Sequence, residues 1–223
     1  MTIKNNIIEF QNKLKIPSCK LIAVSKTKPV QTIREAYDAG LRIFGENKAQ
    51  ELAIKQKSLP DDIQWHMIGH LQRNKVKLIA PFVHMIHAVD SSRLLLEINK
   101  HGEKNKRTIN CLLQVHIATE EAKFGFNDNE LLDLIKDSEL ANFNSIKIQG
   151  LMGMATFTDN MDQIRIEFRK LRNLFDRIKT MNLPQNVNMQ ELSMGMTNDY
   201  AVAIEEGSTM IRVGTAIFGE RYK

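Results

Sequence analysis

The sequence predicts an α/β fold: a single (β/α)8 TIM barrel that occupies residues 1–223 as one domain. Eight short apolar, β-branched segments alternate along the 223 residues with segments of helical periodicity. Parallel strands must be joined by crossovers, and eight such units close into a barrel that can run to about 250 residues. The composition, 43% hydrophobic and 26% charged, is typical of a soluble globular protein with a large core.

Each expected strand is a short run rich in Val, Ile and Leu that ends at a turn signal. In chain order these strands cover residues 21–25, 42–44, 63–68, 83–89, 109–117, 146–152, 187–192 and 210–213. An open doubly wound sheet is the alternative, but it usually has fewer strands and a glycine-rich first turn. The turn Lys26-Thr27-Lys28-Pro29 after the first expected strand contains no glycine, which favours the closed barrel.

Helical spacing, caps and breakers place the helices between these strands. They are expected at residues 30–39, 46–57, 72–79, 91–99, 129–140, 162–181 and 198–206. The clearest amphipathic pattern is in 162–181, where Ile164, Phe168, Leu171 and Phe175 recur at spacings of four, three and four. Only residues 214–223 follow the eighth expected strand, too few for a full eighth helix, so an extra N-terminal helix near 3–14 is expected to cover that gap.

The charge pattern and the cysteines exclude several classes of protein. The net charge of +5 is mild and its basic residues are dispersed; the densest patch, 100–107, contains Gly102 and is expected to be a solvated loop. We therefore expect no nucleic-acid partner. Cys19 and Cys111 lie in or beside apolar runs and are expected to be buried thiols. Without a secretory signal or an apolar run of ~18 residues, the expected location is cytoplasmic, with no membrane partner.

Barrels bind ligands at the carboxyl ends of their strands, and phosphate often lies on the loops after strands 7 and 8. Here the seventh expected strand leads into Ser193-Met194-Gly195-Met196-Thr197, and the eighth ends in Arg212-Val213-Gly214-Thr215. Small and hydroxyl residues let backbone N–H groups approach an anion, and a helix near Asn198 would direct its positive end there. The alternative is that Gly195 and Gly214 only serve tight turns.

Lys26 stands at the end of the first expected strand. Strand alternation places Ile22, Val24 and Lys26 on one side, which would bring the lysine to the barrel rim above an apolar layer. Poor solvation favours the neutral amine, which attacks aldehydes to form a Schiff base. The alternative is a surface lysine whose stem covers apolar residues. Lys28 competes for the role, but it precedes Pro29 and belongs to the exit loop.

Arg212 interrupts an otherwise apolar strand. A buried guanidinium needs a partner, which could be an aromatic ring nitrogen, a ligand oxyanion or a barrel carboxylate in a salt bridge. Together, an aldehyde for Lys26, a phosphate for the last two loops and a ring nitrogen for Arg212 describe pyridoxal phosphate. A sugar-phosphate aldehyde satisfies the first two, which leaves a Schiff-base aldolase possible.

Six motifs occur in order along residues 21–219. They are Ala23-Val24-Ser25-Lys26-Thr27-Lys28-Pro29, Phe44-Gly45-Glu46-Asn47, Trp65-His66-Met67-Ile68-Gly69-His70-Leu71-Gln72-Arg73-Asn74-Lys75, Gly150-Leu151-Met152-Gly153-Met154, Leu192-Ser193-Met194-Gly195-Met196-Thr197-Asn198-Asp199 and Gly207-Ser208-Thr209-Met210-Ile211-Arg212-Val213-Gly214-Thr215-Ala216-Ile217-Phe218-Gly219. With these motifs the sequence resembles the pyridoxal phosphate homeostasis proteins, single-domain relatives of the barrel domain of alanine racemase (fold type III of the pyridoxal phosphate proteins).

The resemblance implies the roles of the cofactor-binding residues. Lys26 would carry pyridoxal 5'-phosphate as an internal aldimine, Arg212 would face the pyridine nitrogen, and Asn47 and His66 would line the site. The phosphate would be held by Ser193, Gly214 and Thr215 with the neighbouring amides of Gly195, Met196 and Thr197. One departure is His116, where the family commonly has Asn; it could alter the ring contacts, or it could be a tolerated polar residue at the rim.

The histidines do not suggest a metal site. His66 and His70 are four residues apart, but they straddle a strand end and the Gly69 turn, so they do not share a helical face. His84 and His87 have opposite strand parity. We expect no metal.

Arg212 also bears on whether the protein is an enzyme. A permanent cation opposite the pyridine nitrogen disfavours its protonation and weakens the ring as an electron sink. The alanine racemase relatives need two bases, one of them from an extra domain of the partner subunit, and none of Tyr37, Tyr200 and Tyr222 has a base-like setting. We therefore expect a monomeric, non-catalytic carrier that buffers pyridoxal phosphate and delivers it to apoenzymes. A racemase, even a weak one, is the first alternative and the aldolase the second.

Overall fold

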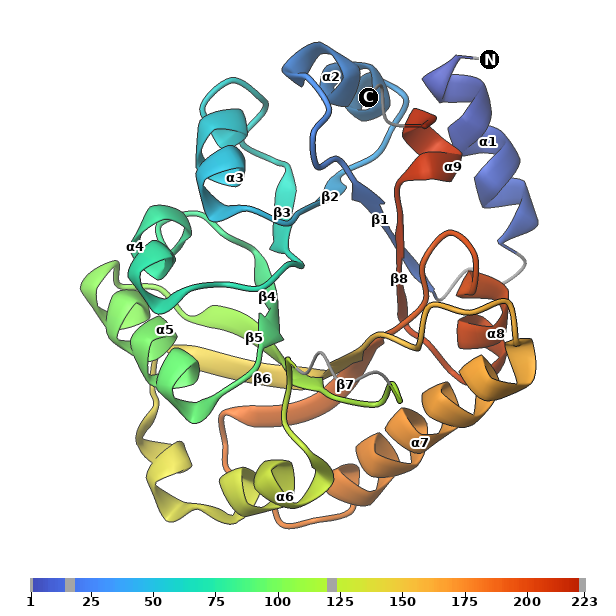
Figure 1. The fold of residues 1–223 in the computed structure, drawn as a ribbon. Helices are drawn as coiled ribbons and strands as arrows, with labels where there is room; N and C mark the ends of the chain where they lie inside the picture. Colours follow the sequence, from blue (N-terminus) through green and yellow to red (C-terminus); the bar gives the residue numbers. More distant parts are fainter. Residues whose placement is uncertain (1, 15–18, 120–123, 221–223) are drawn as a thin grey trace.

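The computed structural model describes residues 2–14, 19–119 and 124–220, and its strands form one closed parallel barrel in the order β1 to β8 (Figure 1). The strands are β1 Lys20–Val24, β2 Ile43–Glu46, β3 Gln64–Met67, β4 Met85–Val89, β5 Ile109–Val115, β6 Ile146–Gly153, β7 Val187–Ser193 and β8 Met210–Val213. The expected (β/α)8 fold is confirmed. Each strand lies within two residues of its expected bounds, because burial on both faces gives the strands continuous apolar runs.

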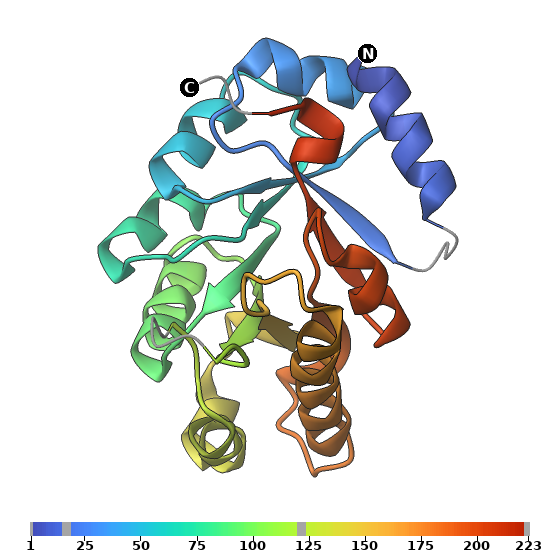
Figure 2. The same ribbon diagram turned by 45° about the vertical axis from the view of Figure 1, so that its right-hand side comes forward.

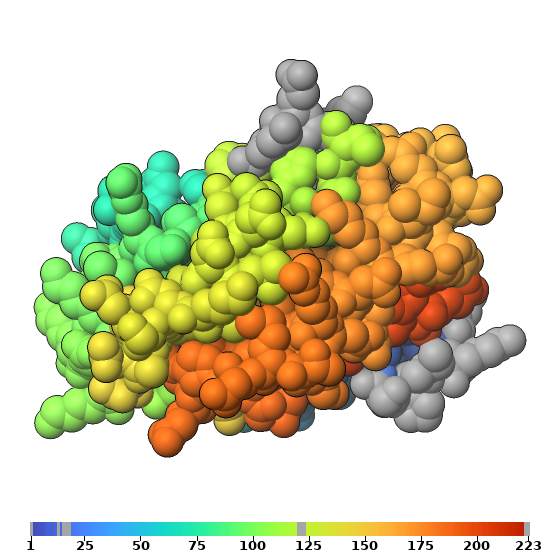
Figure 3. Space-filling model, turned by 90° about the horizontal axis from the view of Figure 1, so that it is seen from below, coloured from blue at the N-terminus to red at the C-terminus, as the bar shows by residue number. Residues whose placement is uncertain are grey.

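The helices form the outer ring. They are α1 Ile3–Lys13, α2 Val30–Asp38, α3 Ala49–Gln56, η1 Arg73–Lys75, α4 Val76–Ile79, α5 Ser92–Lys104, α6 Asp128–Lys136, η2 Ser138–Asn142, α7 Met161–Lys179, α8 Tyr200–Glu205 and α9 Thr215–Phe218. The helices α6 and α7 cover the barrel on the side seen from below in Figure 3, in yellow-green and orange respectively.

Several helix expectations differ from the structure. The expected helix 129–140 is divided into α6, which ends at Lys136, and the 3-10 helix η2. Helix α5 does not stop before Gly102 but continues to Lys104, so much of the segment expected as a solvated loop, 100–107, is helical. A Cβ on Gly102 would lie 2.6 Å from the carbonyl oxygen of Ser145, so this glycine permits a close backbone approach and does not end the helix. The expected helix 72–79 is a 3-10 turn followed by one α-helical turn, α4.

Two apolar layers stabilise the barrel. The larger lies between the strands and the helices; the smaller fills the barrel itself and comprises Ile22, Met85, Ala88, Leu112, Met152 and Met210. Ile22 is therefore an inward-facing residue, as the alternation in the first strand predicted. Cys19 and Cys111 are buried free thiols, as expected.

Helix α1 lies along the seam where β1 pairs with β8, beside α9 and α2 (Figure 2). The side-chain amide of Asn6 donates a hydrogen bond to the carbonyl of Ile217 at 3.0 Å. The N-terminal helix thus covers the gap left by the short α9, as expected. In the described part of the chain, none of the helices combines the length and apolar character needed to cross a bilayer.

Candidate functional site

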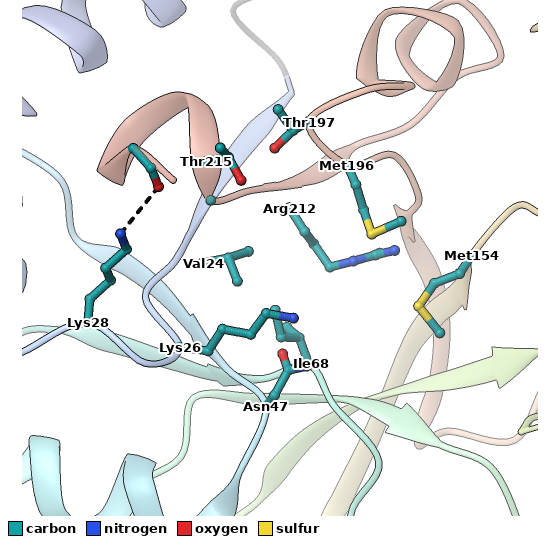
Figure 4. A pocket seen from close by; sticks show the side chains of 12 residues that line it. Val24, Lys26, Lys28, Asn47, Ile68, Met154, Met196, Thr197, Arg212 and Thr215 are labelled. Carbon is teal, nitrogen blue, oxygen red and sulfur yellow. Dashed lines mark hydrogen bonds between the residues drawn. The ribbon is translucent and has the colours of Figure 1, made fainter. Parts of the chain in front are cut away.

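A cavity opens at the carboxyl ends of the strands, where barrel proteins place their ligands. Its volume is about 210 Å³, which suits part or all of one small molecule. The residues that line it lie at the ends of β1, β2, β3, β6, β7 and β8 or in the loops and the short helix that follow them: Val24, Lys26, Lys28, Asn47, Ile68, Met154, Met196, Thr197, Arg212, Gly214, Thr215 and Gly219. Figure 4 shows Lys26, Asn47, Arg212, Thr197 and Thr215 around one space.

The structure separates the two candidate lysines. The stem of Lys26 is half-buried and runs along the cavity wall beside Asn47 (Figure 4). The ammonium of Lys28 instead donates hydrogen bonds to the carbonyls of Phe218, Gly219 and Glu220 at 3.0–3.2 Å, at the end of α9. Lys28 therefore stabilises the last helix, while Lys26 is placed to meet a ligand.

A cluster of charged side chains fixes the backbone on both sides of Lys26. We call Ser25, Glu46, Glu51 and Lys55 the carboxylate–lysine cluster. The Ser25 hydroxyl donates to Glu46 Oε1 at 2.6 Å, and Lys55 Nζ donates to the same oxygen and to the Ser25 carbonyl, each at 2.8 Å. Burial raises the pKa of the fully buried Glu46, while Lys55 and Ser25 oppose that shift.

The cluster also reaches the residue after Lys26. Glu51 Oε1 accepts hydrogen bonds from Lys55 Nζ at 2.6 Å and from the backbone N–H of Thr27 at 2.7 Å. Thr27 has φ of 65°, a left-handed conformation that is unfavourable for a β-branched residue and needs such support. Lys26 is thus held between two residues whose positions this cluster determines.

Arg212 reaches the cavity from β8 and is 4% exposed. Its Nη1 donates to the Ser193 carbonyl at 2.9 Å and to Ser193 Oγ at 2.6 Å, and its Nη2 donates to the Gly153 carbonyl at 3.0 Å. Burial lowers the pKa of Arg212 to about 10, partly offset by Asp199, so the group stays cationic at neutral pH. Among the described residues no carboxylate forms an ion pair with it, so the alternative of a barrel salt bridge is not observed.

The loop after β7 is arranged differently from the expectation. Met196 and Thr197 line the cavity, but Ser193 is fully buried and its side chain contacts Arg212 below the cavity wall. Gly195 is outside the lining: its φ is 94°, and a Cβ there would lie 2.5 Å from that of Ala203. A tight turn accounts for this glycine.

The backbone N–H groups of this loop and the dipole of the helix that follows it should both favour an anion, and both are weaker than expected. The Met196 N–H is already paired with Asp199 Oδ1, at 2.5 Å. The helix α8 begins only at Tyr200 and spans six residues, so it adds little dipole. On the last loop, Gly214 and Thr215 line the cavity as expected, and a Cβ at Gly214 would lie 3.2 Å from the Val24 carbonyl oxygen.

His66 and His116 do not line this cavity. His66 is 2% exposed and lies inside the barrel, where its Nδ1 is 2.8 Å from Nε2 of His87. His87 Nδ1 in turn lies 3.0 Å from Ser193 Oγ, and the ring of His84 stacks on His66 with centroids 5.3 Å apart. His116 lines a neighbouring hollow with Phe124.

Sequence reasoning missed His87. The pairing of β4 with β5 shifts its register between Ile86 and Val89, so simple alternation does not hold there. His84 precedes β4, and both His84 and His87 contact His66 despite their odd spacing. No group of three metal-ligating side chains that could hold an ion occurs in residues 2–14, 19–119 and 124–220.

Comparison with known proteins defines the class first. The model of the alanine racemase N-terminal domain matches residues 1–222. An alanine racemase of Bartonella henselae with covalently bound pyridoxal phosphate shares the fold: its TM-score is 0.71 at 16% identity, and the match covers all of this chain and 61% of that one.

Closer relatives then define the family. The pyridoxal phosphate homeostasis protein of Aquifex aeolicus is 43% identical over 204 residues, 91% of this chain and 87% of its own length. That of Pasteurella multocida is 40% identical over 99% of this chain and 98% of its own. PipY of Synechococcus elongatus, solved with PLP bound, has a TM-score of 0.87 at 34% identity, over 97% of this chain and 100% of its own. This chain belongs to the family of pyridoxal phosphate homeostasis proteins.

Proposed function

We propose that this protein binds pyridoxal 5'-phosphate as a Schiff base on Lys26 and acts in intracellular pyridoxal phosphate homeostasis. It would buffer and deliver the cofactor with little or no turnover. One observation carries the proposal: Lys26 and Arg212, from the adjacent strands β1 and β8, line one small cavity. The similar PipY has been solved with PLP bound, which supports the same ligand here.

The residues of the cavity fit the functional groups of the cofactor. A primary amine, Lys26, can condense with the aldehyde carbon and release water. The hydroxyls of Thr197 and Thr215 and the close backbone at Gly214 suit a phosphate, and Arg212 supplies positive charge beside them. Asn47 offers an amide for a ring substituent. His66, Ser193 and Gly195 do not line the cavity, so they would support the residues that contact the cofactor.

The cavity favours a carrier over a racemase. Bound pyridoxal phosphate supplies an electron sink for the carbanion chemistry of amino acids. Racemisation also needs a base on each face of the substrate, and the described titratable residues that line the cavity are Lys26, Lys28 and Arg212. Tyr37 donates to Asp62 on the outer surface, and Tyr200 packs on Phe10. Tyr222, the remaining tyrosine, lies outside the described residues.

The cellular setting is part of the proposal. We expect a cytoplasmic monomer whose partners are apoenzymes that receive the cofactor, without nucleic-acid or membrane partners. Size-exclusion chromatography with light scattering measures the oligomeric state, and transfer to a pyridoxal phosphate-dependent apoenzyme is followed by recovery of its activity.

The absorbance spectrum of the wild type beside Lys26→Ala tests the ligand. We expect a yellow wild type whose chromophore borohydride fixes to the Lys26 peptide, a colourless Lys26→Ala that retains weak binding, and a Lys28→Ala control like the wild type. A wild type that stays colourless after cofactor is added would overturn the proposal. Robust racemisation of amino acids by the loaded protein would overturn the carrier role.

A further inference from the structure

A second hollow lies beside the Lys26 cavity at the carboxyl ends of the strands. The side chains of Met154 and Met196 line both spaces, so they form a shared wall. The aromatic side chains of Phe124 and Phe157 also line the second space, and we call it the aromatic hollow. Each space has a volume of about 210 Å³, and together they reach the range of roughly 300–1,000 Å³ that is usual for ligand sites.

The aromatic hollow gathers much of the exposed apolar surface of the described residues. Nine large apolar side chains are exposed in that part of the chain, and the four that line this hollow are Phe124, Met154, Phe157 and Met196. Exposed apolar side chains normally scatter singly over a surface, and a group of them around one hollow indicates a binding site.

The loop that carries Phe157 is held in place by a buried carboxylate. Glu167 of α7, which is 4% exposed, accepts hydrogen bonds from the backbone N–H and the hydroxyl of Thr156, each at 2.7 Å. The Thr156 hydroxyl also accepts a hydrogen bond from the backbone N–H of Thr119 at 3.1 Å. Phe157 follows directly and is 87% exposed, so this fixed loop presents a ring that contributes little to the apolar core.

Phe124 is fixed from two sides. The side-chain amide of the buried Gln114 donates a hydrogen bond to its carbonyl at 3.1 Å, and its ring lies 4.5 Å from that of His70, measured between centroids. His70 Nδ1 in turn lies 2.9 Å from Asp90 Oδ2. His70 belongs to the motif of residues 65–75, of which the cavity uses Ile68. Support of the aromatic hollow gives a second part of this motif a role.

The charges around the two spaces differ. Among the described residues that line the aromatic hollow there is no Asp, Glu, Lys or Arg. The next hollow, which shares His116 with it, is lined by Glu130 and Lys170. The cavity on the other side of the methionine wall contains Lys26 and Arg212. The two adjoining spaces therefore suit a ligand that is charged at one end and apolar at the other.

The amine of Lys26 points across its cavity toward the side formed by Met154 and Met196 (Figure 4). We propose that the aromatic hollow binds the apolar substituent of a primary amine whose nitrogen enters the Lys26 cavity. Thioether side chains adapt to varied shapes, so the methionine wall can accommodate the link between the two parts. The inference rests on the proposed function, because the amine would react with pyridoxal phosphate held at Lys26.

A primary amine in this position competes with Lys26 for the aldehyde carbon of the cofactor. The incoming nitrogen forms a double bond to that carbon, the bond from the carbon to Lys26 Nζ breaks, and the two protons of the incoming amine end on the lysine nitrogen. No oxidant, reductant or water is consumed. The exchange would detach the cofactor from the protein chain and leave the apolar substituent in the aromatic hollow.

Stable conjugates test the site without any turnover. Pyridoxal phosphate is joined reductively to phenylethylamine, to phenylalanine or to ethanolamine, and calorimetry measures the affinity of each conjugate for the ligand-free wild type. We expect the phenylethylamine conjugate to bind about tenfold more tightly than the ethanolamine conjugate, because its ring is buried in the aromatic hollow. The phenylalanine conjugate shows whether the class of amines includes amino acids, since it adds a carboxylate to the same ring.

Phe157→Ser and Ala155→Leu test whether the aromatic hollow supplies this preference. The first substitution removes an exposed wall, and the second narrows the hollow; in each variant the tenfold ratio should fall to about threefold or less. A ratio of two affinities in one protein is insensitive to a general loss of folded material. Ile166→Ser is the matched control, because it replaces an exposed apolar side chain of α7 that does not line the hollow, and it should keep the full ratio.

The outcomes separate the inference from the proposed function. A wild type that binds pyridoxal phosphate but binds the phenylethylamine and ethanolamine conjugates alike would overturn the inference alone, and so would an unchanged ratio in Phe157→Ser and Ala155→Leu. A wild type that binds neither cofactor nor conjugates would overturn both. Two other occupants would also contradict the inference: an acceptor enzyme, if Phe157→Ser slows cofactor transfer at an unchanged ratio, and a second copy of this chain, if light scattering shows a dimer that Phe157→Ser dissociates.

Discussion

The two sides of the cavity are supported in opposite ways. Behind Lys26, the carboxylate–lysine cluster pairs a buried ammonium with two carboxylates. Behind Arg212 lie the hydroxyl of Ser193 and the imidazoles of His87 and His66. Burial lowers the pKa of both imidazoles, so they are neutral. One side therefore balances its charges in direct ion pairs. On the other side no described carboxylate contacts the Arg212 cation directly, and Asp199 acts on it only through a longer-range electrostatic interaction.

This difference separates stability from binding. Charges that are buried together depend on one another, and removal of one leaves the other uncompensated. A buried cation without an ion-pair partner costs free energy in the empty protein and interacts strongly with an anion that enters. We expect the Lys26 side to contribute mainly to stability and the Arg212 side mainly to ligand affinity.

The largest effect is expected for Lys55→Met. The substitution keeps the stem of the side chain but leaves Glu46, which is fully buried, without its ammonium partner. The free energy of unfolding should fall by about 3–5 kcal/mol, measured by urea denaturation. Lys57→Met, at an exposed position after α3, is the matched control and should stay within about 0.5 kcal/mol of the wild type. If Lys55→Met and Lys57→Met lowered the free energy of unfolding equally, the buried charge pair on the Lys26 side would not contribute specially to stability.

Arg212→Met should show the reverse pattern. Loss of the cation and its hydrogen bonds should weaken pyridoxal phosphate binding by about tenfold to a hundredfold. The ligand-free variant should lose much less stability than Lys55→Met, because Arg212 has no ion-pair partner among the described residues. Cofactor titration and urea denaturation of the same preparation measure both quantities. Full affinity in this variant would contradict the assigned role.

The neutral imidazoles predict an acid-sensitive stability. The folded-state pKa of His66 is lowered to about 3 from the usual 6.5, so below pH 6.5 the unfolded chain binds a proton that the folded protein does not. Stability should therefore fall as the pH falls from 6.5 toward 3, by about 1.4 kcal/mol per pH unit for this residue. By pH 5 the loss attributable to His66 is about 2 kcal/mol.

The pH dependence is measured by denaturation from pH 8 to pH 5. His66→Asn should show a shallower slope below pH 6.5 and a constant offset from the wild type above pH 7.5. Parallel curves across the whole range would show that His66 is protonated equally in both states.

The smallest effect is expected for Glu51→Gln. This side chain is partly exposed, and Lys55 keeps its contact with Glu46 in the variant. The weaker support for Lys55 and for the Thr27 amide should lower the free energy of unfolding by about 1 kcal/mol or less. A loss as large as that of Lys55→Met would mean that Glu51, and not Glu46, is the main partner of the lysine.

The sequence allowed the barrel to be predicted because its evidence is local. Apolar runs, helical periodicity and the inward parity of Ile22 all depend on near neighbours along the chain, and the closed barrel confirms them. Gly102 shows the limit, since it looks like a helix stop, and only the approach of the Ser145 carbonyl explains it.

The site was predictable to the extent that it lies at strand ends. Lys26, Asn47, Thr197, Arg212 and Thr215 all line the cavity, because motif position gives their place on the rim. The support beneath them was not predictable. Ser193 and His87 are 106 residues apart in the sequence, and their contact depends on which residues of β4 and β7 meet inside the barrel.

The seam between β1 and β8 has a consequence for how the protein folds. Ile22 of β1 is paired with Arg212 of β8, so the cavity straddles the junction of the first and the last strand in chain order. Contacts between such distant segments carry the largest loop-closure cost and close the barrel. The binding site therefore exists only when β1 and β8 are paired and the barrel is closed. A ligand bound at this junction stabilises the closed barrel relative to any form in which the two strands are unpaired.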